Sequence, residues 1–360
     1  MKTIRTGSFE QLLIHKSFLV MKTKRLFTLF TTLIAFTAFG QNVITVDNSV
    51  GANAQYSDLQ SAIDNASSGD TIYIHASELS YGNATIDKQL KLVGYGHSNT
   101  IKNTYLGSII LEDNASGSEF TGLYVLSGID CQNSVTVIND LVFENCRFYA
   151  LSFGSSFYAG CNNVLVKGCV VPTISGYATN MIITNNVLTR VYIDENYQSV
   201  TIRNNFFFHP SSGSPNCIIN YSSANGSITA QNNIFYYTSA SSSVAINVAG
   251  VIYEYCLSYT PNGTYEIMNG SNNLDNVNPL FVNVINNQYE ADIDDFHLQA
   301  GSPAIGAGVN GFDIGLYDGS AFEFNNFGFT PGIPTVTITA ITEQVAPGDN
   351  VEVTIQSNSN

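Results

Sequence analysis

The sequence predicts an all-β protein, a right-handed parallel β-helix solenoid with a short N-terminal capping helix and a small C-terminal β extension. Three observations predict this fold. The composition suits strands and tight turns, the middle of the chain repeats with a solenoid period, and apolar residues recur two positions apart in every repeat.

The composition favours a chain with a large core and many turns. Hydrophobic residues make up 44% of the 360 residues, and charged residues make up 11%, against roughly 25% in ordinary soluble domains. The formal net charge is -15. Such a chain repels phosphate backbones, so we expect no nucleic-acid partner.

The chain begins with the pattern of an exported protein. Basic residues at 22–25 precede an apolar stretch at 26–39, and a small-x-small cleavage pattern ends at Gly40. The apolar stretch is shorter than the roughly 20 residues that a membrane helix needs, so we expect no membrane span. We predict a secreted protein (extracellular, periplasmic or cell-surface) that is cleaved near Gly40.

Five segments follow from these patterns. We interpret Met21 as the true start, although a long basic region before the apolar stretch is the alternative. The predicted segments are an over-extended start at 1–20, a signal peptide at 21–41, a β-helix domain at 42–320, a linker at 321–334 and a β-strand tail at 335–360.

A short helix is expected before the repeats. Ser57 and Gln60 form a capping-box pattern, and an apolar face follows at helical spacing. That face consists of Leu59, Ala62, Ile63 and Ala66. A lone amphipathic helix needs an apolar surface to cover, and the open end of a solenoid provides one.

Six repeats align on one anchor position. The steps between anchors are 23, 17, 19, 28 and 23 residues, and their mean of 22 lies in the solenoid range of roughly 20–45 residues. Stacked Asn side chains can bond to one another and to neighbouring backbone, and Cys fills the same column with a small apolar group. The predicted structural ladder is Cys146, Cys169, Asn186, Asn205, Asn233 and Cys256.

The residues before the anchor describe a strand and a turn. Positions three and five before it are apolar and form the inner face, while position two before it faces solvent. The position directly before the anchor is Asn or Gly in five repeats, which favours a left-handed backbone conformation. This turn column is Asn145, Gly168, Asn185, Asn204, Asn232 and Tyr255.

The six cysteines fit no zinc or haem spacing. Export would permit disulfides, but we interpret them as buried, unpaired core residues.

Three stretches carry a family resemblance. They are the entry at 56–63, 69–74 and 90–94, the Asn-Asn turns of the middle coils, and the exit at 278–281, 295–308 and 313–315. Together they resemble the pectin-lyase-like superfamily of right-handed parallel β-helices, of the exported bacterial type, over roughly residues 43–320. The resemblance implies a fold but no single activity, because this fold hosts lyases, hydrolases, esterases, epimerases and adhesins.

The resemblance also implies where a lyase site would lie. Lyases of the superfamily hold calcium with acidic residues and use Arg or Lys as the base. The best matching residues are Arg190, Asp194 and Glu195, with Arg203 and Lys167 on nearby coils. Both acids come from one short stretch, so a solvated loop is the alternative. A hydrolase or esterase pair is disfavoured because residues 141–259 contain a single Asp.

Asp292, Asp294 and Asp295, with His297, have the spacing of a calcium site. We interpret the stretch as structural, since it belongs to the exit motif, and we predict no cofactor. Calcium is the alternative.

A column of outward residues could bind sugar. Three positions after the anchor stand Tyr149, Pro172, Thr189, Phe208, Tyr236 and Tyr259. Exposed rings in a row can stack on sugars, so the binding candidates are Tyr149, Phe208, Tyr236 and Tyr259. The alternative is that a loop or the C-terminal strands cover them.

Three functions therefore stay open. The first is a non-catalytic, monomeric β-helix that binds a polysaccharide or cell-surface glycan. The second is a polysaccharide lyase that acts on acidic, uronic-acid glycans with calcium. The third is a purely structural surface module.

Overall fold

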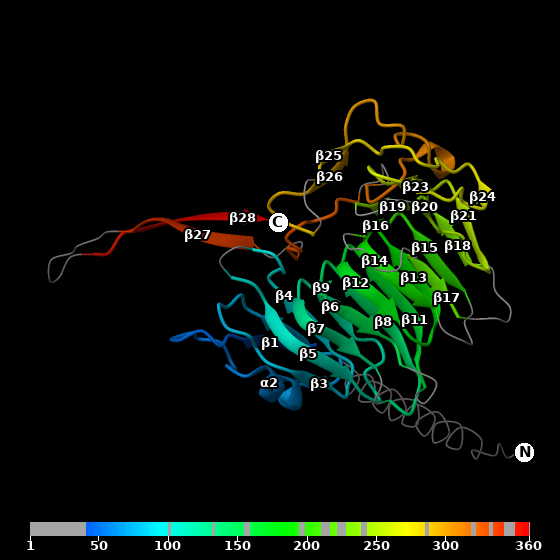
Figure 1. The fold of residues 1–360 in the computed structure, drawn as a ribbon. Coiled ribbons are helices and arrows are strands. Elements are labelled where there is room, and N and C mark those ends of the chain that lie inside the picture. Colours follow the sequence, from blue (N-terminus) through cyan, green and yellow to red (C-terminus); the bar gives the residue numbers. More distant parts are fainter. Residues whose placement is uncertain are drawn as a thin grey trace, which may run out of the picture. The chain divides into compact units, whose positions relative to one another are not determined.

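The protein is a parallel β-helix built from two long sheets (Figure 1). The computed structural model describes residues 41–99, 102–131, 134–154, 159–193, 199–209, 217–221, 228–238, 243–284, 288–317, 322–330, 334–341 and 350–359. The predicted extra start and signal peptide at 1–40 lie outside the described residues. The predicted all-β fold class is confirmed.

Among the described residues, each sheet has eleven strands, and successive coils add one strand to each. The first sheet is, in order, β1 (Val43–Val46), β2 (Thr71–Ile74), β4 (Lys91–Gly94), β6 (Glu119–Thr121), β8 (Ile138–Glu144), β11 (Cys161–Lys167), β13 (Ala178–Thr184), β15 (Val200–Arg203), β18 (Ile228–Gln231), β21 (Val251–Glu254) and β24 (Gly270–Ser271). The second sheet is β3 (Ala84–Ile86), β5 (Tyr105–Leu111), β7 (Tyr124–Asp130), β10 (Ala150–Ser152), β12 (Val170–Ser175), β14 (Val187–Ile193), β16 (Phe206–His209), β19 (Ile234–Tyr237) and β22 (Leu257–Tyr259), joined at the side by β9 (Arg147–Phe148) and β17 (Ile218–Asn220). Figure 1 shows the strands of successive coils side by side.

The inner columns of the repeats pair in parallel register across the first sheet. Val166 pairs with Ile183, which pairs with Ile202, and the same column continues through Ala230 to Tyr253. All five are fully buried in one continuous core. Coils of unequal length therefore keep one register, because the extra residues lie outside the paired strands.

In each of the six aligned repeats, a residue in the left-handed conformation turns the chain from the first sheet to the second. The φ angles in the turn column are 49° at Asn145, 65° at Gly168 and 53–56° at the other four members. Tyr255 adopts the same conformation at 53°, although a positive φ is less favourable for tyrosine than for Asn or Gly. The recurrence of one turn explains why the anchor residues stack directly above one another.

The anchor residues form a continuous column inside this corner, and all six are fully buried. Asn186 donates through its backbone N–H and its side-chain Nδ2 to Asn205 Oδ1, both at 3.0 Å. Asn205 repeats both bonds to Asn233 Oδ1 at 3.0 Å. Where Cys takes the place of Asn, Cys169 Sγ accepts the N–H of Cys146 at 3.5 Å. The six cysteines are all buried and in the thiol form.

The helix α2 (Leu59–Asn65) covers the N-terminal end of the coil, and Leu59, Ala62 and Ile63 are its buried residues. The predicted capping box is wrong. Asp58, not Ser57, is the N-cap, and its Oδ1 accepts the N–H of Ser61 at 2.7 Å. An Asp carboxylate is the stronger acceptor at the positive end of a helix.

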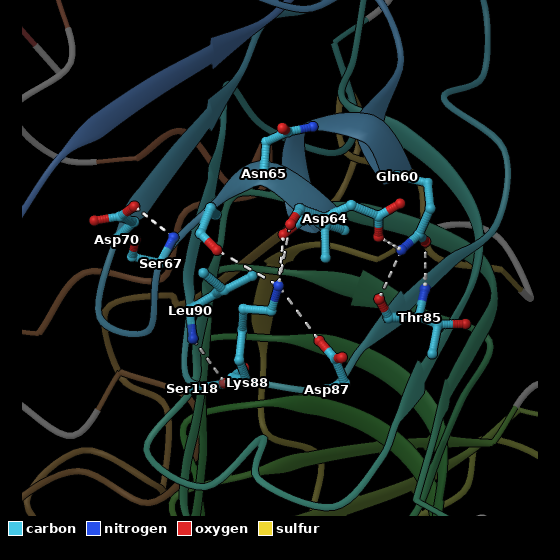
Figure 2. Close-up of polar contacts among 12 residues, drawn as sticks. Gln60, Asp64, Asn65, Ser67, Asp70, Thr85, Asp87, Lys88, Leu90 and Ser118 are labelled. Carbon is cyan, nitrogen blue, oxygen red and sulfur yellow. Dashed lines mark hydrogen bonds and ion pairs between the residues drawn. The ribbon is translucent and has the colours of Figure 1, made fainter.

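Gln60 has a different role from the predicted one (Figure 2). Its Oε1 accepts the N–H of Thr85 at 2.8 Å, and its Nε2 donates to Thr85 O at 3.2 Å. The side-chain amide thus pairs with the first strand of the second sheet as a neighbouring strand would.

Lys88 caps the other end of α2 (Figure 2). Its Nζ donates to the carbonyl oxygens of Ile63 at 3.1 Å and of Asp64 and Ala66 at 3.4 Å. Carbonyls at a helix C-terminus lack intrahelical donors and carry partial negative charge.

We expect Lys88→Met to lower the free energy of unfolding by about 1–2 kcal/mol, because these carbonyls lose a charged donor. Urea denaturation would measure the loss. Lys102→Met removes the same charge from an exposed position and is expected to change stability by less than about 0.5 kcal/mol. Equal effects of the two variants would contradict the capping role.

A C-terminal segment covers part of the outer face of the second sheet. It contains the antiparallel pair β25 (Phe281–Asn283) and β26 (Asp295–Leu298) and the 3₁₀ turn η1 (Val309–Gly311). Its buried residues pack on an apolar outer column of the sheet. The column contributes Val170, Val187, Phe206, Ile234 and Leu257, and the segment contributes Phe296, Ala304, Ile314, Leu316 and Phe324.

The predicted linker is packed where the structure describes it, at 322–330. Phe324 is 6% exposed, and Thr330 Oγ1 donates to Gly94 O at 2.7 Å. In the tail, β27 (Pro334–Ile341) and β28 (Val353–Ser359) pair antiparallel. A small parallel pair, β20 (Ser243–Val244) and β23 (Thr264–Tyr265), completes the strands of the described residues. No helix in the described part of the chain is long and apolar enough to cross a membrane.

Candidate functional site

The structure places the three lyase candidates that it describes on two different sheets. Arg190 lies in β14 of the second sheet, whereas Lys167 and Arg203 lie in β11 and β15 of the first. Asp194 and Glu195 lie outside the described residues. Arg190 donates to Tyr192 Oη at 2.9 Å and contacts His209 Nε2 at 3.3 Å.

Lys167 and Arg203 do share a cavity of about 470 Å³ on the outer face of the first sheet. Lys167 Nζ lies 3.9 Å from Glu144 and 5.1 Å from the centre of the Phe322 ring. Arg203 is exposed. This cavity therefore contains two of the candidate cations, Lys167 and Arg203, but not Arg190.

The predicted calcium candidates do not converge on one point. Asp294 is 3% exposed, its Oδ2 accepts the N–H of Glu290 at 2.7 Å, and burial raises its pKa to about 6. Asp295 Oδ1 instead contacts His297 Nδ1 at 2.6 Å. Among the residues that the structure describes, no group of three or more His, Cys, Asp or Glu side chains is arranged to hold a metal ion. These acids therefore do not fit a calcium site.

The aromatic column faces outward as predicted, and the alternative that another segment covers its rings holds for three of the four binding candidates. Phe208 is 3% exposed, and Tyr236 and Tyr259 are partly buried against the C-terminal segment. Tyr236 lies 6.1 Å, between ring centres, from Phe281 of that segment. Tyr149 differs from them, because its side chain is 69% exposed.

The uncovered end of the column forms one wall of a cavity of about 490 Å³, which we call the aromatic groove. Tyr149, Pro172, Thr189 and Phe208 line it from the column. Its remaining walls are mostly apolar, with polar groups from Arg147 and Gln288. An apolar cavity of this size with a few polar groups is typical of small-molecule binding sites.

Arg147, in β9, lies between two tyrosine rings at one wall of the aromatic groove. Its Cζ is 5.0 Å from the centre of the Tyr124 ring and 5.3 Å from that of Tyr289. Nη1 donates to Ser98 Oγ at 3.2 Å, and Ser98 Oγ also contacts His97 Nδ1 at 2.7 Å. Contact with two rings restrains the guanidinium group and leaves most of its donors available to a ligand.

His97 is neutral at physiological pH. Burial, with a smaller contribution from the charge of Arg147, lowers its pKa to about 3. Arg147 is therefore the charged member of this group.

The sequence reasoning missed Arg147, Tyr124 and Tyr289. One signal could have found the first of them. The position directly after the anchor is apolar in five repeats, namely Val170, Val187, Phe206, Ile234 and Leu257, and Arg147 interrupts it. Tyr289 comes from a segment far away in sequence, and no repeat pattern indicates its position.

No protein-family model matches the chain, and no curated protein matches it.

Proposed function

We propose that the protein is an exported β-helix of the pectin-lyase-like superfamily that binds a glycan in the aromatic groove without catalysis. The exposed ring of Tyr149 at this groove carries the proposal. The apolar face of a sugar ring packs well on an aromatic ring, and polar groups at the margin can bond its hydroxyls. The signal-like pattern before Gly40 supports export.

Tyr149→Ala is expected to weaken glycan binding by about five- to thirtyfold, since one stacked ring at a sugar site contributes on the order of 1–2 kcal/mol. Glycan-array screening would find the ligand, and calorimetry would measure its affinity for the two proteins. Tyr221→Ala is a matched control, because Tyr221 is 58% exposed and lies outside the aromatic groove. Loss of affinity in both variants, or in neither, would refute the assignment of the site.

The lyase alternative has one supporting observation, the cavity shared by Lys167 and Arg203. Two cations on one groove could hold the carboxylates of a uronic-acid polymer. An ultraviolet assay for unsaturated product, with and without calcium, tests this alternative. Product formation that disappears in Arg203→Met would replace the non-catalytic proposal.

A further inference from the structure

A second, smaller cavity adjoins the aromatic groove. It measures about 290 Å³ and shares Tyr124, Arg147 and Tyr289 with the groove. Its other walls are mostly polar, with Ala291 and Ile293 as the apolar members, in contrast to the groove. We call it the charged cavity, because Arg147, Glu290 and Asp292 line it.

Arg147 supplies the positive side of the charged cavity. Its guanidinium forms no ion pair with any acidic side chain that the structure describes. In a chain of net charge -15, an arginine held by two rings and a serine, with no acidic partner among the described residues, is placed to receive an anionic group.

Asp292 supplies a negative side. It is exposed, and within the described ranges it too has no ion pair. Arg147 and Asp292 therefore line the same cavity without an N–O contact of 4.0 Å or less. Burial contributes most to the raised pKa of Tyr289, Arg147 lowers that pKa, and Asp294, Tyr317 and, least of all, Asp292 raise it.

This charge distribution selects between classes of ligand. A simple anion at Arg147 would be repelled by the carboxylates of Asp292 and Glu290, and a simple cation near them would be repelled by Arg147. A group with both charges satisfies both sides at once.

We infer that the glycan carries a sugar residue with both a carboxylate and an ammonium group, which the charged cavity receives. This inference rests on the proposed function, since the same ligand places an adjoining ring in the aromatic groove. The carboxylate binds Arg147, and the ammonium group faces Asp292.

Four sugars of increasing charge content test the inference. They are glucose, which is neutral, glucosamine, which carries an ammonium group, N-acetylmuramic acid, which carries a carboxylate, and muramic acid, which carries both. We expect muramic acid to bind at least about tenfold more tightly than each of the others in calorimetry. Arg147→Met should remove its advantage over glucosamine, and Asp292→Asn should remove its advantage over N-acetylmuramic acid.

The outcomes separate this inference from the proposed function. If N-acetylmuramic acid binds as tightly as muramic acid, or if the advantage of muramic acid persists in both variants, the charged cavity does not receive a group with both charges, while glycan binding stands.

Glycine, a zwitterion without a sugar ring, tests the charged cavity by itself. Binding of glycine that Arg147→Met abolishes, with no binding of any glycan, would retain the charged cavity and refute the proposed function. No binding of muramic acid or glycine would refute the inference. Asp292 is exposed, so its variant tests recognition without disturbing the fold.

Discussion

Asn205→Ala is expected to lower the free energy of unfolding by about 4 kcal/mol, because the change leaves several buried polar groups without partners at once. Its Oδ1 accepts two bonds from Asn186, and its Nδ2 donates to Ile183 O at 2.9 Å and to Asn233 Oδ1 at 3.0 Å. Each stranded group costs about 1–3 kcal/mol, and in a solenoid the loss falls on the interfaces with both neighbouring coils.

Urea denaturation of two further variants makes this test specific. Asn205→Cys should cost roughly half as much, since Cys at the same column accepts a backbone N–H in the native chain. Thr229→Ala, on the exposed face of β18, should change stability by less than about 0.5 kcal/mol. A loss below about 1 kcal/mol for Asn205→Ala would show that the ladder does not stabilise the stack.

Phe143→Ala is expected to destabilise the protein by a similar amount, about 4 kcal/mol, but for a different reason. The side chain is fully buried and stacks on Phe120 with ring centres 5.1 Å apart. It also meets Phe148 edge-on at 5.9 Å and Phe153 at 6.0 Å. Truncation removes the burial of a whole ring and leaves a cavity among its neighbours, which cannot collapse because paired strands fix them.

The matched control is Phe312→Ala, since that ring is 46% exposed. We expect a loss of about 1 kcal/mol or less, measured by the same denaturation. Phe143→Leu should recover more than half of the loss, because it restores most of the apolar volume. Equal losses for the two alanine variants would mean that the stacked rings contribute little.

The repeat made the fold predictable from the sequence. A period of two within each strand placed Val166 and Ile183 inside the coil, and the recurrence of Asn or Gly located the turn. These are local sequence signals, and they recur in several repeats of the chain. The N-cap at Asp58 was missed because Ser57 and Gln60 fitted a capping box equally well. The side chain of Gln60 is not available for such a box, since it bonds to Thr85, which lies 25 residues away in the sequence.

The candidate site was less predictable, because distant segments complete it. The alternation of a strand correctly places Phe208 and Tyr236 outside the coil, but it says nothing about what covers them. The cover consists of residues such as Phe281 and Phe296, which follow some 45–90 residues later and belong to no repeat. Tyr149 is exposed because it lies beyond that cover.

The corner column has a consequence for how such a chain can change. Asn186, Asn205 and Asn233 remain adjacent although 19 and 28 residues separate them. Adjacency in the column is therefore set by the order of the coils and not by the number of residues in each coil. Segments between corners can therefore gain or lose residues without altering which strands are neighbours. The protein is therefore a modular scaffold, in which one loop can be redesigned while the strand pairing of every other coil stays the same.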